Sequence, residues 1–136
     1  MKKIVLQIGG AYAVLSVVLG AFGAHAFKAV LASDKLASFE VGVRYQMYAA
    51  LLLLIVGFGL DFSRKIERLA GRLVIVGAFL FSVSIYFLAF QDVWGVKLSF
   101  FGPITPLGGM LFIVGLVLFT ISFSRKIDCN DKFRSK

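Results

Sequence analysis

Residues 69–90 read LAGRLVIVGAFLFSVSIYFLAF, and this stretch decides the fold. Crossing the hydrocarbon layer of a membrane takes about 20 residues of helix, because the layer is roughly 30 Å thick. The stretch is long enough, and its one charged residue, Arg72, lies near its beginning. It does not alternate polar with apolar residues, as a membrane strand would over about ten residues. Residues 69–90 therefore predict a transmembrane helix.

Three further apolar runs of similar length cover residues 4–27, 41–60 and 106–123. The chain has 136 residues, of which 60% are hydrophobic and only 16% are charged, whereas a soluble domain averages about 45–50% and about 25%. So short a chain could not hide this excess of apolar surface in a core, but lipid accepts apolar side chains on the outside of a protein. We therefore predict one all-α domain, residues 1–136, that forms a four-transmembrane-helix bundle in the lipid bilayer.

Lysine and arginine are unevenly divided between the two sides of this bundle. One side has Lys2, Lys3, Arg64, Lys65, Arg68, Arg72, Arg125, Lys126, Lys132, Arg134 and Lys136. The other side has Lys28, Lys35, Arg44 and Lys97. Short loops rich in Lys and Arg stay in the cytoplasm. Eleven basic residues against four therefore predict that both termini are cytoplasmic.

The first run also resembles a cleavable signal peptide, since two lysines precede it and Ala24-His25-Ala26 is a small-x-small sequence. Its length, however, exceeds the roughly 7–15 residues of a signal core. It carries small residues at intervals of three or four, namely Gly9, Ala13, Ser16, Gly20 and Ala24. These share one helical face, where another helix can approach closely. We therefore expect the first run to be a retained span, packed tightly enough that Gly20→Leu would overpack it.

Two segments on the outer side carry signals for the start of a helix. Ser33 is placed as an N-cap, and Leu36 and Phe39 lie on one face of the helix that would follow. This predicts a short interfacial helix that runs into the second span. Thr105 is expected to cap the fourth span, with Pro106 at the first helical position, where no N–H is needed.

Small and polar residues recur on the later spans as well. Gly108, Gly109 and Gly115 predict close packing of the fourth span. The amides of Gly108 and Gly109 could alternatively meet an anion at the helix N-terminus. Ser82, Ser84 and Tyr86 of the third span are expected to make hydrogen bonds between helices or, for the serines, back to their own helix.

Four ordered motifs resemble a known family: GAFGAHA at 20–26, VRYQMY at 43–48, FSVSIY at 81–86 and ITPLGG at 104–109. The chain is similar to an uncharacterised bacterial membrane family, classified as a domain of unknown function, whose eukaryotic relative is called transmembrane protein 256. The resemblance implies a small four-span protein of the bacterial inner membrane with no established activity.

The chain departs from that family's pattern at three positions. The family has His where this chain has Ala49, Gly where it has Val83, and Trp where it has Leu116. A family function that depended on the missing histidine would be absent here or performed differently.

The polar residues near the outer boundary form a candidate cluster. They are His25, Glu40, Arg44, Tyr45, Gln46 and Tyr48. Glu40 and Arg44 stand four apart in the order that favours a helical ion pair, and His25 could titrate near neutral pH. The cluster either anchors the helix ends or binds a ligand, because polar residues within membranes are often functional.

The sequence lacks the residues that several classes of function would need. The net charge of +8 lies at the ends of the apolar runs, so we expect no binding of nucleic acid. A lone cysteine, Cys129, and one histidine predict neither a metal site nor a cofactor. No ionisable residue lies at the middle of a span, which disfavours proton-coupled transport and an enzyme. We expect an interaction protein that packs with its own copies or another membrane protein; the alternative is a small transporter or channel for a neutral or lipid-like molecule.

Overall fold

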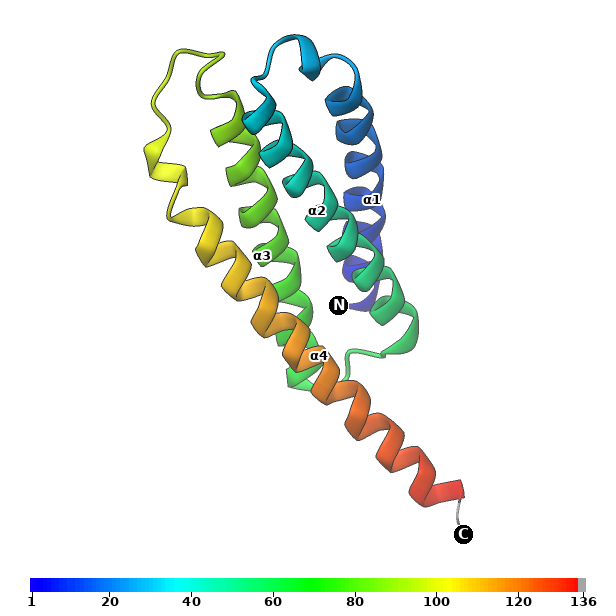
Figure 1. The fold of residues 1–136 in the computed structure, drawn as a ribbon. Coiled ribbons are helices and arrows are strands. Elements are labelled where there is room, and N and C mark those ends of the chain that lie inside the picture. The colour runs from blue at the N-terminus through cyan, green and yellow to red at the C-terminus, as the bar shows by residue number, and fades with distance from the viewer. Residues whose placement is uncertain (135–136) are drawn as a thin grey trace.

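The computed structural model describes the backbone of residues 1–134 and the side chains of residues 1–126. It contains α1 (Lys2–Ala24), η1 (Phe27–Ala29), α2 (Ser33–Gly59), α3 (Lys65–Phe90), η2 (Ser99–Phe101) and α4 (Ile104–Arg134) (Figure 1). Within this described part no strand occurs, and four helices are long and apolar enough to cross a membrane. The predicted all-α fold with four spans is confirmed.

Each helix begins earlier than the apolar run that predicted it. The largest difference is in α2, which starts at Ser33 and continues without a break to Gly59. The segment expected to form a short interfacial helix before the second span is indeed helical, and it forms the first turns of α2. Cys129 and the basic residues beyond Lys126 lie outside the described side chains.

The helices pack in the order of the chain: α1 on α2, α2 on α3 and α3 on α4 (Figure 1). α1 and α3 make few contacts, and α1 and α4 share no substantial interface. The bundle is therefore open, with α2 and α3 in the middle. We call the end that carries Met1 and the α2–α3 connection the termini end, and the opposite end, with the α1–α2 and α3–α4 connections, the loop end.

Glycines bring the backbones of α3 and α4 together. A Cβ added to Gly77 would lie 2.5 Å from the backbone nitrogen of Phe112, and one added to Gly108 would lie 2.5 Å from that of Phe81. At Gly115 it would lie 2.9 Å from the backbone nitrogen of Val74. Side chains at these positions would force the two backbones apart. Gly109 differs, because its added Cβ would meet only the ring of Phe81, at 3.5 Å.

The small-residue face of α1 contacts α2 over part of its length. Gly9 and Ser16 are buried, Ala13 and Gly20 are half-buried, and Ala24 is exposed. A Cβ at Gly9 would lie 3.1 Å from Cβ of Leu53, which is a tight contact. At Gly20 the nearest atom would be Cγ1 of Val43 at 3.6 Å, an ordinary contact. The close approach expected at Gly20 is therefore found at Gly9.

Both predicted helix caps were wrong. Leu36 N–H donates to Ala32 O at 2.8 Å, so Ala32 accepts the first helical hydrogen bond and Ser33 is already inside α2. Leu107 N–H donates to Pro103 O at 3.4 Å, so α4 begins at Ile104, two residues before Pro106. A proline in the first turn is tolerated because the N–H groups there have no partner within the helix.

Side chains from α3 and α4 hold the α2–α3 connection at the termini end. Phe62 is 3% exposed, has a left-handed φ of 56° and packs edge-on against Phe119 of α4. Arg68 Nη1 donates to Phe62 O at 2.9 Å, and Lys126 Nζ donates to Gly59 O at 2.8 Å. These contacts fix the connection between the two halves of the bundle.

Candidate functional site

The six residues of the predicted outer cluster do not form one site. Tyr45 and Tyr48 are exposed and pack against each other, 5.6 Å between ring centroids. His25 is exposed at the C-terminal end of α1. Gln46 is 5% exposed and faces the interior of the bundle. These residues were grouped because they lie at similar depths in the membrane, but a similar depth does not bring their side chains together.

The predicted ion pair between Glu40 and Arg44 is not formed. Arg44 Nε instead donates to the backbone oxygen of Glu40, at 3.4 Å. Both side chains are exposed, and they line a shallow cavity of about 260 Å³ between α1 and α2 at the loop end. Charged side chains at this boundary need no protein partner, because their long stems reach the interface, where water or lipid headgroups form hydrogen bonds with the charged groups.

A hydrogen-bonded polar group lies inside the bundle and joins three helices. Gln46 Nε2 of α2 donates to Tyr12 O of α1 at 3.3 Å. The Tyr86 hydroxyl of α3 donates to Gln46 Oε1 at 2.7 Å. Tyr12 in turn donates its hydroxyl to Ile75 O of α3, at 2.9 Å. We call Tyr12, Gln46 and Tyr86 the polar triad.

Ser82 and Gly42 place Tyr86 against α2. Ser82 Oγ donates to Gly42 O at 2.9 Å, which holds α3 against α2. A Cβ at Gly42 would lie 2.7 Å from the Tyr86 ring, so glycine leaves the space that the ring fills. Ser84 Oγ donates to Phe81 O and lies 2.7 Å from Thr105 Oγ1. The hydrogen bonds expected of these serines, between helices and within their own helix, are confirmed.

The polar triad lines a crevice between α1 and α3. The deeper cavity, about 190 Å³, is lined by Tyr12, Leu15, Leu19, Gln46, Ala78, Phe79, Val83 and Tyr86. The second, about 420 Å³, is lined by Leu19, Phe27, Phe39, Val83, Tyr86, Phe87, Phe90 and Trp94. Because Leu19, Val83 and Tyr86 line both, we treat the two as one crevice. It runs from the triad to the aromatic residues of the loop end.

The crevice wall is apolar and uncharged, and the triad has hydrogen-bonding capacity left over. One N–H of the Gln46 amide donates to Tyr12 O, which leaves the second N–H. The hydroxyl hydrogens of Tyr12 and Tyr86 are both used, so their oxygens retain acceptor capacity. The crevice can therefore accommodate a neutral group that both donates and accepts a hydrogen bond.

Buried polar residues also occur at the termini end. Glu67 is 4% exposed, accepts a hydrogen bond from Ser122 Oγ at 3.2 Å and lies 3.9 Å from Arg64 Nε. Its other oxygen accepts from the backbone N–H of Arg64, at 3.4 Å. This carboxylate therefore ties the start of α3 to α4. Among the described residues, no three His, Cys, Asp or Glu side chains are grouped as a metal site would require.

Two of the four buried serines among the described residues, Ser82 and Ser16, should respond differently to alanine. Ser82→Ala removes an interhelical hydrogen bond and should lower the free energy of unfolding in detergent by about 0.6–1.7 kcal/mol. Ser16 is buried without a partner among the described atoms, so Ser16→Ala should leave stability unchanged or raise it. Equal losses in the two variants would contradict the assigned hydrogen bond.

The structure defines a polytopic membrane protein built from one open bundle of four spans, with a lateral crevice on one side. The chain belongs to the family described as "Protein of unknown function (DUF423)", which matches residues 19–109. It is similar to the UPF0382 membrane protein YwdK of Bacillus subtilis, with 38% identity over 67% of this chain and 76% of the relative. A UPF0382 membrane protein of Haemophilus influenzae is 33% identical over 67% of this chain and 73% of that protein. No solved structure matches the chain.

Two of the three departures noted in the sequence lie close to the polar triad. Ala49 is fully buried one turn along α2 from Gln46. Val83 lines both parts of the crevice, so this side chain lies where the two cavities meet. Leu116 is 37% exposed on α4 and has no part in the crevice.

The sequence interpretation missed two polar groups. Tyr12 is a polar residue near the middle of an apolar run, and its position away from the ends of the span was the available signal. Glu67 and Ser122 lie near the ends of spans, where polar residues are common. Their pairing across 55 positions of sequence carries no local signal.

Proposed function

We propose that this protein binds a membrane-resident, lipid-like molecule with an uncharged polar group in the crevice between α1 and α3. The observation that supports this proposal best is the placement of the polar triad at the deep end of an otherwise apolar cavity. A pocket with apolar walls and a few convergent polar groups is the usual form of a small-molecule site.

The packing of the small residues favours this proposal over an interaction protein. Gly77, Gly108 and Gly115 join α3 to α4, Gly9 joins α1 to α2, and Ser16 on the same face of α1 is buried. The faces expected to bind a partner are thus largely occupied within one chain. The crevice, by contrast, is an apolar surface that no helix covers within the described part of the chain.

The same crevice indicates the chemistry of the ligand. No charged side chain lines it, and an unpaired charge is costly to bury in lipid. A hydroxyl can accept from the free N–H of Gln46 and donate to a phenol oxygen. A long-chain alcohol therefore fits better than a fatty acid anion, and its chain would extend past Val83 towards Trp94.

Trp94 provides a test, since it is the one tryptophan of the chain and lines the part of the crevice nearest the loop end. We would titrate purified protein in detergent with octadecanol brominated at mid-chain and record the quenching of Trp94 fluorescence. The wild type should show a saturable component. Val83→Phe should remove it, because the larger side chain fills the space where the two cavities meet.

Val117→Phe is the matched control, because Val117 is 52% exposed on α4 and does not line the crevice. It should retain the saturable quenching. The methyl ether of the same alcohol, which cannot donate a hydrogen bond, should bind more weakly. Linear, unsaturable quenching in the wild type, or equal quenching in both phenylalanine variants, would refute the proposal.

We propose that the termini end faces the cytoplasm and that the membrane is the bacterial inner membrane. The basic residues support this orientation. With Cys129 changed to serine, Lys97→Cys should react with a membrane-impermeant maleimide on intact cells, and Lys2→Cys should react only after lysis. Labelling of position 2 but not position 97 on intact cells would reverse the orientation.

A further inference from the structure

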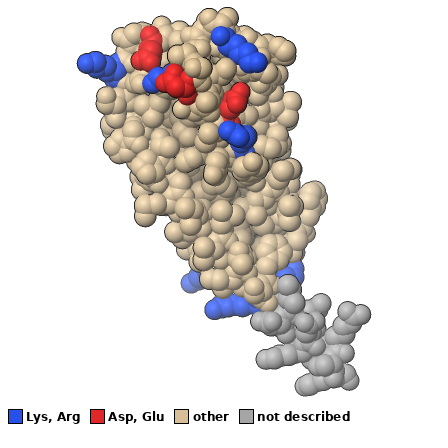
Figure 2. Space-filling view, in the orientation of Figure 1, with Lys and Arg blue, Asp and Glu red and all other residues tan. Residues whose placement is uncertain are grey.

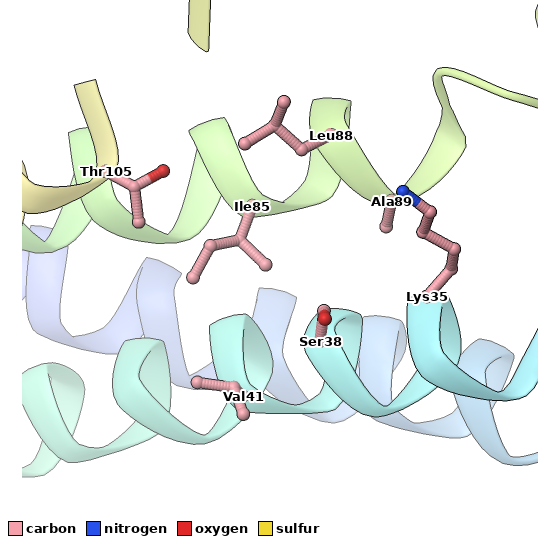
Figure 3. A pocket seen from close by; sticks show the side chains of 7 residues that line it. All are labelled: Lys35, Ser38, Val41, Ile85, Leu88, Ala89 and Thr105. Atoms are coloured by element: carbon pink, nitrogen blue, oxygen red, sulfur yellow. The ribbon is translucent and has the colours of Figure 1, made fainter. Parts of the chain in front are cut away.

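A separate cavity lies between α2 and α3 at the loop end, beside the start of α4, and it shares no lining residue with the α1–α3 crevice. Its volume is about 270 Å³, and its lining residues are Lys35, Ser38, Val41, Ile85, Leu88, Ala89 and Thr105. Figure 3 shows Lys35 at one end, beside Ala89, with Val41 and Ile85 further along. The cavity therefore has a cationic end and an apolar body.

An ion pair borders the cationic end. Lys35 Nζ lies 3.5 Å from Asp92 Oδ2, and the two side chains are 28% and 69% exposed. An exposed pair of this kind stabilises a fold only slightly. A ligand that offers each side chain an opposite charge can therefore replace the pair at little cost.

We propose that this cavity binds a phospholipid whose zwitterionic headgroup ends in a primary ammonium. The phosphate pairs with Lys35, the ammonium pairs with Asp92, and one acyl chain lies along Val41, Ile85 and Leu88. An apolar groove that begins at a charged pair matches the order of these parts in the lipid. The cavity also lies at the end of the spans, where headgroups are found.

The distribution of charge supports a zwitterionic ligand over an anionic one. Figure 2 shows acidic and basic side chains together at the loop end of the visible face, whereas only basic side chains appear at the termini end. An anionic headgroup would satisfy Lys35 and be repelled by Asp92. A choline headgroup carries the positive charge but cannot donate hydrogen bonds to the Asp92 carboxylate.

Native mass spectrometry tests this proposal. The protein would be released from detergent with equimolar phosphatidylethanolamine, phosphatidylcholine and phosphatidylglycerol that carry identical acyl chains. The wild type should retain phosphatidylethanolamine over phosphatidylcholine by about fivefold, as expected for one partly exposed charged contact. Asp92→Asn should abolish this preference. Lys35→Gln should reduce retention of phosphatidylethanolamine, whereas Lys97→Gln, which removes another lysine of the loop end, should not.

A charge exchange, Lys35→Asp with Asp92→Lys, separates binding from folding. It keeps an ion pair and the net charge, so the melting temperature should not change, but it places a carboxylate where the phosphate would lie. Retention of phosphatidylethanolamine should fall to the level of phosphatidylcholine. Wild-type retention in this variant, or equal retention of all three lipids by the wild type, would overturn the proposal. The site does not depend on alcohol binding in the α1–α3 crevice, so either proposal can fail alone.

Discussion

Replacing Gly108 with leucine should separate α3 from α4 and cost at least about 3 kcal/mol of unfolding free energy, the upper end of the usual cost of overpacking. The added Cβ would lie 2.5 Å from the backbone nitrogen of Phe81 and 2.9 Å from Gly77 O. Backbone atoms cannot change rotamer to make room, so the helices must move apart. Unfolding in detergent by increasing sodium dodecyl sulfate, followed by circular dichroism, measures the loss.

Gly10→Leu is the matched control for this substitution. Gly10 also lies within a transmembrane helix, but its added Cβ would meet no atom within 4 Å apart from the adjoining residues and backbone of its own helix. Leucine has a higher helix propensity than glycine, so this variant should be as stable as the wild type or slightly more stable. Similar losses in both variants would show that α3 and α4 do not approach as closely as described.

Phe62→Ala should have a similarly large effect, a loss of about 3–5 kcal/mol, as is typical when a buried phenylalanine is truncated. The ring fills the space under the α2–α3 connection and packs against Phe119 at the termini end. Phe58→Ala is the control, because Phe58 is 75% exposed near the same end of α2. Its loss should be within about 0.5 kcal/mol.

Phe62→Gly separates the ring from the backbone. Both variants lose the ring, but φ of 56° costs a residue with a Cβ roughly 1–2 kcal/mol. Glycine adopts this conformation freely, so Phe62→Gly should be more stable than Phe62→Ala. The reverse order would contradict the left-handed conformation at this position.

The number of spans could be predicted from sequence because each is a continuous apolar run, and the bilayer fixes the length that such a run needs. The close packing at Gly108 and Gly115 of α4 could also be predicted, since small residues mark close packing between helices, but the same prediction for Gly109 was wrong. Gly77 was overlooked, although it supplies the α3 side of that contact. A single glycine within an apolar run does not reveal which neighbour approaches it.

The candidate site could not be predicted because residues were grouped by depth alone. Arg44 and Gln46 lie at nearly the same depth, but residues two apart in a helix do not face each other. Arg44 therefore reaches the boundary, whereas Gln46 enters the bundle. The hydrogen bond from Tyr12 to Ile75 O spans 63 positions and depends on the order of helix packing, which hydropathy does not encode.

The sequence likewise did not predict that the bundle is open. Four spans with short connections suit a closed bundle as well as a row in which α2 and α3 lie in the middle. The crevice exists only because α1 packs on α2 while making few contacts with α3. The proposed ligand site therefore depends on an arrangement that only the structure supplies.

Photolabelling tests the central claim, that the α1–α3 crevice holds a lipid-like alcohol, most directly. Protein in nanodiscs would be irradiated with octadecanol that carries a mid-chain diazirine, and the adducts would be mapped by mass spectrometry with and without excess unlabelled octadecanol. We expect competed labelling at Leu15, Leu19 and Val83, and uncompeted labelling at the lipid-facing Val117. The account would be contradicted if excess octadecanol reduced labelling at no position. It would also be contradicted if the residues of the crevice were not labelled.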